Sequence, residues 1–280
     1  MPWILRIKTM KFRNCLLASA AICGTAYFLL HGRQGHPDLP KLRAWNYAHR
    51  GLHGDGRPEN SMAAFRAALD RGYGIELDIH LLKDGNLAVL HDSLLQRTTG
   101  REGRIEDLTT EELADYRLEG TEETIPTFRQ VLDLFAGKAP LIIELKPVDG
   151  NHAALCEAAC RMMEGYSGLY CMESFDPRCV AWLRVHRPEV IRGQLTEYSL
   201  DMEYHVPMPL RFALSHNLLN CCGRPDFIAY RYSHRKKSCT NFICEKLLGV
   251  QGVAWTLKTP EDHAGALAQG LIPIFENYIP

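Results

Sequence analysis

From about Ala44 onward, the chain alternates short runs of β-branched or apolar residues with longer amphipathic stretches. This alternation is typical of βα units, in which helices join parallel strands. The expected strands lie at 45–49, 75–79, 87–90, 141–145, 169–174, 191–195, 227–231, 252–256 and 272–275. The expected helices lie at 61–70, 127–136, 152–164, 177–186, 207–218, 240–248 and 260–268, and another begins near Thr109. The pattern therefore predicts one strand more than an eight-stranded barrel holds.

The spacing of two runs explains the extra strand. The run at 87–90 follows the run at 75–79 after only a short segment around Lys83, Asp84 and Gly85. A parallel crossover needs about a dozen residues or more, so we expect 87–90 to fold back as an antiparallel hairpin partner. The other eight strands and their helices match the size of a (β/α)8 TIM barrel. The predicted fold class is therefore α/β, a TIM barrel with an extra hairpin strand after its second barrel strand.

A membrane-inserting helix is expected before the barrel. The run at 15–30 has sixteen residues without a charge. The basic residues before it are Arg6, Lys8, Lys11 and Arg13. This pattern predicts a single-pass membrane protein with its N-terminus inside and the barrel outside, although about 20 residues are usual for a span. A cleaved signal peptide, with Gly24-Thr25-Ala26 as a poor cleavage site, and a core helix of the barrel are the alternatives.

The composition fits a globular body behind this segment. The chain has 280 residues, of which 46% are hydrophobic, and a net charge of -1, so no nucleic-acid partner is expected. We expect an anchor and linker at 1–36 and a TIM-barrel domain at 37–280. The ten cysteines form no Cys-x-x-Cys pair, so buried thiols are expected rather than a disulfide scaffold or a zinc site.

Carboxylates and cations lie at the ends of the expected strands. Residues i and i+2 of a strand point the same way, so Glu76 and Asp78 project together, as do Glu144 and Lys146. Burying three carboxylates in a barrel is costly unless a cation compensates them. Glu76, Asp78 and Glu144 make an all-oxygen set that suits one divalent cation, Mg2+ or Ca2+, better than zinc. Arg50 and Lys146 would then hold a phosphate, although Glu144 and Lys146 taken alone could form a simple ion pair.

Two histidines complete the candidate site, His49 at the end of the first expected strand and His91 after the hairpin. Imidazole titrates near neutral pH, so a pair across a scissile P–O bond can serve as general base and general acid, in either order. His80 shares the face of Asp78 and is expected to support the site rather than bind the metal. Trp255 either walls the substrate pocket or packs in the core. Together these residues predict a metal-dependent phosphodiesterase with a small-molecule substrate.

The motifs of the N-terminal half also form an ordered series. They are AHRG at 48–51, PENSMAAF at 58–65, GIELDIHLLKDG at 74–85, LAVLHD at 87–92, and IPTFRQVLDLF through LIIELK at 125–146. In this order and spacing they resemble the glycerophosphodiester phosphodiesterase family, and the likeness covers about residues 45–280. It departs at Leu82, where the family often has Thr, and at Phe275-Glu276-Asn277, where Thr-Asp is common.

The resemblance implies a TIM barrel that hydrolyses glycerophosphodiesters to an alcohol and sn-glycerol 3-phosphate. Carried over by position, it implies that His49 and His91 are the acid/base pair. It implies that the metal ligands are Glu76, Asp78 and Glu144, and that the phosphate contacts are Arg50 and Lys146. It further suggests attack by the glycerol 2-hydroxyl through a cyclic phosphate, with direct attack by water as the alternative. Two other functions stay open, a lysophospholipase D that acts on a lysophospholipid and a catalytically silent phosphodiester-binding protein.

Overall fold

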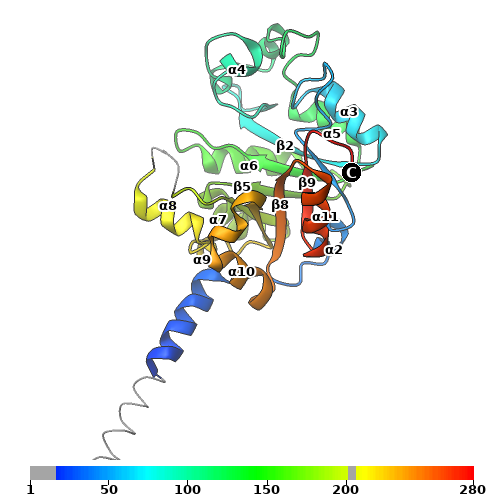
Figure 1. The fold of residues 1–280 in the computed structure, drawn as a ribbon. Coiled ribbons are helices and arrows are strands. Elements are labelled where there is room, and N and C mark those ends of the chain that lie inside the picture. Colours follow the sequence, from blue (N-terminus) through cyan, green and yellow to red (C-terminus); the bar gives the residue numbers. More distant parts are fainter. Residues whose placement is uncertain (1–16, 201–205) are drawn as a thin grey trace, which may run out of the picture.

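The computed structural model describes residues 17–200 and 206–280, and within them eight parallel strands close into a barrel (Figure 1). Around the barrel these strands are β1 Tyr47–His49, β2 Gly74–Leu81, β4 Leu141–Leu145, β5 Tyr170–Ser174, β6 Arg192–Thr196, β7 Phe227–Arg231, β8 Gln251–Leu257 and β9 Ile272–Phe275. Each pairs in parallel with the next, and β9 pairs with β1. Strand β3 (Leu87–Val89) is bonded to β2 outside this ring and runs antiparallel to it. The predicted barrel with one hairpin strand is confirmed.

Helices connect the strands, and several begin at the expected capping residues. Helix α3 (Met62–Asp70) begins after Ser61, whose hydroxyl accepts a hydrogen bond from the first turn. Helix α5 (Phe128–Phe135) begins with a capping box in which Thr127 and Gln130 bond each other's backbone. The remaining α-helices with printed bounds are α2 Leu39–Leu42, α4 Gln96–Thr99, α6 His152–Met162, α7 Pro177–His186, α8 Met208–Ser215, α9 Asn220–Gly223, α10 Cys239–Phe242 and α11 Pro260–Ala268.

Two of the expected helices take another form. The helix expected near Thr109 is a short 3₁₀ segment, η2 (Glu111–Asp115), because the chain becomes extended at Tyr116 and then forms a β-bridge. The helix expected at 240–248 is α10 followed by a π-helical turn, η4 (Ile243–Leu247). Two further 3₁₀ segments are η1 Ile105–Asp107 and η3 Tyr232–Lys237.

The barrel interior is apolar in its lower layers. Side chains from several strands fill it, among them Tyr47, Ile142, Phe227, Val253 and Ile274. Packing explains the glycine at position 193 on β6, because a Cβ atom there would lie 2.1 Å from the Phe227 ring. A larger cluster packs the outer faces of the strands against the surrounding helices. Because apolar residues close the lower barrel, the charged residues of the strands gather at its C-terminal end, where TIM barrels carry their sites.

An N-terminal helix projects away from the barrel (Figure 1) and is described over residues 17–30. The predicted span at 15–30 therefore lies partly outside the described residues, and the basic residues before it lie wholly outside them. Within the described ranges, no helix combines the length and the apolar character needed to cross a bilayer. The end of the helix packs on the barrel through Leu30, which is buried beside Val250. Arg33 then pairs with the buried carboxylate of Asp226 at 2.5 Å.

Candidate active site

The predicted acidic residues meet at the C-terminal ends of the strands. His49 pairs in register with Glu76, and Asp78 pairs with Glu144, so the sheet makes them neighbours. One oxygen each from Glu76, Asp78 and Glu144 lies within 4.8 Å of the other two. All three side chains are buried. The structure therefore brings the three predicted ligands together, and we call them the acidic trio.

The acidic trio fits a hard divalent cation. Its members offer only carboxylate oxygens, the ligands that Mg2+ and Ca2+ prefer. The Oδ1 atom of Asp78 is buried and makes no hydrogen bond with the described residues, although the Lys146 ammonium lies 3.4 Å away, and we take it as a candidate ligand atom. The residues that would hold the ion are Glu76, Asp78 and Glu144, and the choice of ion stays a prediction.

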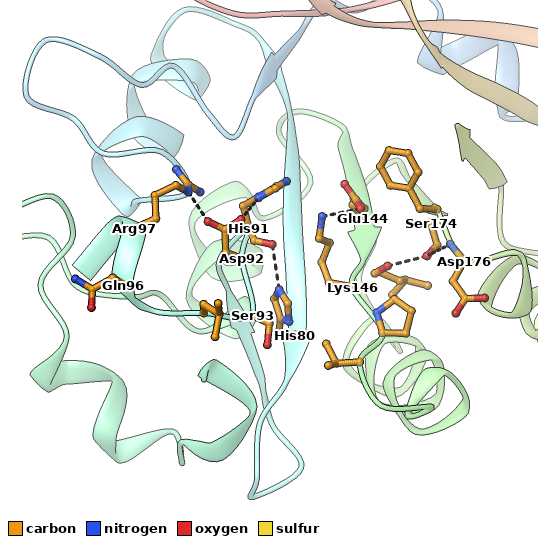
Figure 2. A pocket seen from close by; sticks show the side chains of 15 residues that line it. His80, His91, Asp92, Ser93, Gln96, Arg97, Glu144, Lys146, Ser174 and Asp176 are labelled. Atoms are coloured by element: carbon orange, nitrogen blue, oxygen red, sulfur yellow. Dashed lines mark hydrogen bonds and ion pairs between the residues drawn. The ribbon is translucent and has the colours of Figure 1, made fainter. Parts of the chain in front are cut away.

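Lys146 lies against the acidic trio. Its ammonium is 2.9 Å from Glu144 Oε1 and 3.4 Å from Asp78 Oδ1, so the simple ion pair foreseen as an alternative is present. The same side chain lines an open cavity, where its charge can also meet a phosphate (Figure 2). Its role as a phosphate contact stays a prediction.

Burial and neighbouring charges set the protonation of the acidic trio. Burial, followed by the charge of Asp78, raises the pKa of Glu76 well above its usual value. Burial also raises the pKa of Glu144 to about 7, with Lys146 opposing the shift. Burial disfavours the charge of Asp78 as well, but Lys146, His91 and Arg50 together outweigh it, and the pKa of Asp78 is lowered. Asp78 is thus the constant anion, whereas burial favours the protonated form of Glu76 and protonates Glu144 in part of the molecules near pH 7, and a bound cation would displace these protons.

Arg50 is held by acidic side chains on several sides. Its backbone is left-handed, with φ of 54°, and its N–H donates to Glu76 Oε2 at 3.2 Å. Its guanidinium donates to Glu59 at 3.0 Å and lies 3.6 Å from Asp78. Asn60, which is buried, donates to the same oxygen of Asp78, Oδ2, at 2.9 Å. The loop after β1 therefore positions a cation next to the acidic trio.

Figure 2 shows His91 beside Asp92, with Arg97 next to them. The Nδ1 atom of His91 lies 2.6 Å from Asp92 Oδ1, and Arg97 donates to the other oxygen of Asp92. His80 Nε2 lies 3.3 Å from the backbone oxygen of His91, while its Nδ1 lies 2.7 Å from Glu106. His80 therefore supports the segment that carries His91 and takes no part in the acidic trio.

His49 also lies between two carboxylates. Its Nε2 is 3.8 Å from Glu76 Oε2, and its Nδ1 is 3.3 Å from Glu276 Oε2. Burial lowers the pKa of His49, and burial lowers the pKa of His91 to about 4. Both rings are therefore neutral at pH 7 in this structure. Each has a carboxylate at Nδ1, which leaves Nε2 as the atom for proton transfer.

Two open cavities flank these residues. One, of about 720 Å³, is lined by His91, Glu144, Lys146 and Phe175 among others (Figure 2). The other, of about 840 Å³, is lined by His49, Arg50, Glu276, Trp255 and a group of basic residues. Trp255 thus lines a cavity, and its indole donates to the Ala229 carbonyl at 3.0 Å. Its contact with substrate stays a prediction.

Several residues of the site were not predicted from the sequence. Glu173 on β5 pairs in register with Glu144, is buried, and has an oxygen without a hydrogen-bond partner among the described residues. Burial, followed by the charge of Glu144, raises its pKa well above the usual value. The alternation with Cys171, two residues earlier in the expected strand, could have placed Glu173 inside the barrel. The contacts of Asp92, Arg97 and Glu276 had no comparable local signal.

The comparison with known proteins agrees with this architecture. The model of the glycerophosphoryl diester phosphodiesterase family matches residues 49–279. The chain is 40% identical over 261 residues to human glycerophosphodiester phosphodiesterase 1, a match that covers 80% of this chain and 75% of the human protein. It is 43% identical over 107 residues to a glycerophosphodiester phosphodiesterase of Bacillus altitudinis, covering 36% of this chain and 43% of that relative, which is less than half of its length.

A solved structure shows the same fold. It is an Oleispira antarctica phosphodiesterase in complex with the product sn-glycerol-3-phosphate, with a TM-score of 0.67 and 24% identity. The likeness covers 84% of this chain and 93% of that one. With the family match spanning most of the chain, the resemblance seen in the motifs is confirmed. The chain belongs to the glycerophosphoryl diester phosphodiesterase family, a family of phosphoric diester hydrolases.

Proposed function

We propose that this protein hydrolyses glycerophosphodiesters in a metal-dependent reaction that releases an alcohol and sn-glycerol 3-phosphate. The observation that carries the proposal is the convergence of Glu76, Asp78 and Glu144 within 4.8 Å, with His49 adjoining them. Family membership supports the same reaction. The product bound to the Oleispira antarctica relative supports the identity of the phosphate product.

The acidic trio is the proposed metal site. A divalent cation bound there would neutralise charge on the phosphate and acidify a nearby hydroxyl. Arg50 and Lys146 are the proposed phosphate contacts, and both already lie beside Asp78, at 3.6 Å and 3.4 Å. Phosphate and carboxylate compete for the same two cations, so substrate binding draws them toward the phosphate oxygens.

His49 and His91 are the proposed proton carriers. Each is neutral at pH 7 in this structure, so each can accept a proton through Nε2. An anionic phosphate nearby favours the charged imidazole and raises the pKa of both rings, so one of them can serve as acid to the leaving alcohol. Glu276 and Asp92 hold the two rings from the Nδ1 side. The order of the two roles is left open by this arrangement.

The test is a hydrolysis assay with glycerophosphocholine, with and without a chelator, in which sn-glycerol 3-phosphate is measured. We expect turnover that the chelator abolishes and that Mg2+ or Ca2+ restores. We expect His49→Ala and His91→Ala to lower kcat by about 10²- to 10⁴-fold with unchanged thermal stability. A matched control is His186→Ala, at the end of α7 and far from the trio in the chain. Unchanged turnover in both variants would refute the mechanism.

A second candidate is lysophospholipase D activity. One observation favours it, because the cavity beside His91 has apolar residues at its rim, among them Leu94 and Phe175, which are 62% and 38% exposed. Such a rim can accept part of an acyl chain. Assay of lysophosphatidylcholine against glycerophosphocholine separates the two functions, because release of choline from the lipid alone would replace the first proposal with the second.

We also propose that residues 1–36 attach the protein to a membrane, with the barrel outside. Support comes from the exposed apolar side chains of the N-terminal helix, including Leu17, Ile22 and Phe28. The helix joins the barrel beside Pro225 and Val250, which precede β7 and β8, so the opposite end carries the site. Full-length protein found wholly in the soluble fraction, after cells are broken and membranes sedimented, would contradict this proposal.

A further inference from the structure

A second group of metal-ligating side chains lies on the other side of His49 from the acidic trio. One ligand atom each from His49, His53 and Glu276 lies within 4.8 Å of the other two. These side chains are 14%, 17% and 16% exposed, at the edge of the larger cavity. Neither His53 nor Glu276 has a role in the proposed reaction beyond the contact with His49.

The fold explains why these three residues meet. Ala48 pairs in register with Phe275, so the residues that follow, His49 and Glu276, are neighbours on adjacent strands. The chain then turns back through two left-handed residues, Arg50 with φ of 54° and Gly51 with φ of 79°. This turn returns His53 to the same carboxylate, 3.7 Å from Glu276 Oε1.

The separations between the ligand groups are close to those of a tetrahedral site. Zinc binds imidazole nitrogen and carboxylate oxygen at about 2.0–2.2 Å, so two ligand atoms of a tetrahedral site lie roughly 3.3–3.6 Å apart. The separation between His49 Nδ1 and Glu276 Oε2 is 3.3 Å. The separation between His53 Nε2 and Oε1, the other oxygen of this carboxylate, is 3.7 Å, slightly above that range. Two imidazoles and one carboxylate also leave the fourth position open, as in metal sites with three protein ligands.

Two of the ligand atoms lack a hydrogen bond in this structure. The Nδ1 atom of His49 and the Nε2 atom of His53 are both buried and face Glu276 at 3.3 Å and 3.7 Å, without a well-formed hydrogen bond among the described residues. A buried polar atom without a partner is costly, and a metal ion satisfies it. Lys258 forms an ion pair with Glu276 at 3.8 Å, but it is 61% exposed and can move into solvent.

We propose that His49, His53 and Glu276 form a second metal site that binds a transition-metal dication such as Zn2+, separate from the acidic trio. Imidazole ligands suit zinc, whereas Mg2+ and Ca2+ prefer an all-oxygen set, so the two sites select different ions. The sites share the His49 ring, which faces the second site through Nδ1 and Glu76 through Nε2.

This shared ring has a consequence for turnover, which rests on the proposed function. A neutral imidazole with a metal on Nδ1 carries its proton on Nε2, where it can donate but cannot accept. With Nδ1–H directed at Glu276, Nε2 instead has a free lone pair. Zinc in the second site therefore prevents Nε2 of His49 from accepting a proton and inhibits hydrolysis, while Mg2+ or Ca2+ in the acidic trio supports it.

The test is a titration of the full chain with Co2+ in excess Mg2+, followed by visible absorption. Four-coordinate Co2+ absorbs much more strongly than Co2+ in an octahedral oxygen site, so the readout does not depend on activity. Cys221 and Cys222, whose sulfurs lie 3.9 Å apart, could bind the same ion, so the titration uses a Cys221→Ser, Cys222→Ser background. We expect one equivalent to give the strong band and Zn2+ to remove it.

Two ligand variants and two controls complete the test. His53→Ala and Glu276→Gln should each weaken Co2+ binding by at least about 10-fold, since loss of a ligand costs no less than loss of an outer-shell partner. His186→Ala should keep the absorption band. Asp78→Asn should also keep it, even if the acidic trio no longer binds a metal. A wild-type chain without the band, or a band equally tight in both ligand variants, would overturn the proposal. Zinc inhibition that His53→Ala does not relieve would overturn its regulatory consequence alone.

Discussion

The ammonium of Lys146 lies 2.9 Å from Glu144 Oε1, inside the group of carboxylates proposed to bind a metal. This contact supplies a positive charge to three buried acids before any ion arrives. Burial is still the larger influence on Glu144, and it raises the pKa of this residue to about 7. Close to neutral pH, Glu144 therefore carries a proton in part of the molecules.

The proton on Glu144 predicts a pH-dependent metal affinity. A carboxylate ligand must lose its proton to bind a cation, so Mg2+ affinity should fall as the pH drops below about 7. Between pH 8 and pH 6, we expect a loss of about 10-fold or more, measured by calorimetric titration. Glu144→Gln should lose most of the affinity together with this part of the pH dependence. Equal affinity at the two pH values would contradict the prediction.

Arg97 predicts a separable effect on catalysis. It binds Asp92, the partner of His91, and donates to Glu59 at 2.6 Å, while making no contact with the acidic trio. Arg97→Met should release Asp92 and lower kcat by roughly 10-fold, equivalent to about 1.4 kcal/mol. Mg2+ affinity should not change.

Arg101 offers the matched control for Arg97. Its guanidinium lies over the Tyr116 ring, 4.3 Å from the centroid, and does not contact His91 or Asp92. Arg101→Met should therefore leave kcat unchanged. If Arg97→Met weakens Mg2+ binding as strongly as it lowers kcat, the assignment of Arg97 to His91 is wrong.

Glu173 predicts a stabilising substitution. Its folded-state pKa is raised well above the value of a free glutamate, first by burial and then by Glu144. A raised pKa means that the folded state favours the protonated form, so this residue costs stability as the pH rises above its unfolded pKa. Glu173→Gln is permanently neutral and should raise Tm in the presence of chelator, by more at pH 8 than at pH 5. An equal shift at both pH values would show that the charge of Glu173 is not the cause.

The junction between the N-terminal helix and the barrel predicts where the chain can be shortened. Leu30 and Arg33 pack on the barrel, and Arg33 pairs with a fully buried carboxylate of Asp226. A chain that begins at Asp38 should lose about 3 kcal/mol of unfolding free energy relative to one that begins at Ala26, because the buried carboxylate of Asp226 loses its Arg33 partner.

Chemical denaturation of the two shortened chains measures this difference. Arg33→Ala in the longer chain should reproduce most of the loss, which separates the ion pair from the removed residues. Two chains of equal stability would show that the segment 26–37 contributes nothing to the barrel.

The sequence alone determined the barrel and the acidic trio. Strand periodicity is local, so Glu76 and Asp78 had to face the same way, and the short link between 75–79 and 87–90 required a hairpin. Strands of a TIM barrel end at one face, so residues at those ends had to converge. The confirmed barrel and the grouping of Glu76, Asp78 and Glu144 follow from these two rules.

Only the tertiary structure decided which partners these residues have. The contacts of Arg97 with Asp92 and Glu59, and the meeting of His49, His53 and Glu276, join segments far apart in sequence or loops without periodicity. The meeting of His49, His53 and Glu276 depends on the register between β1 and β9 and on the left-handed turn after β1. Such contacts depend on how the closed barrel aligns its strands and loops, and no local pattern of residues encodes that alignment.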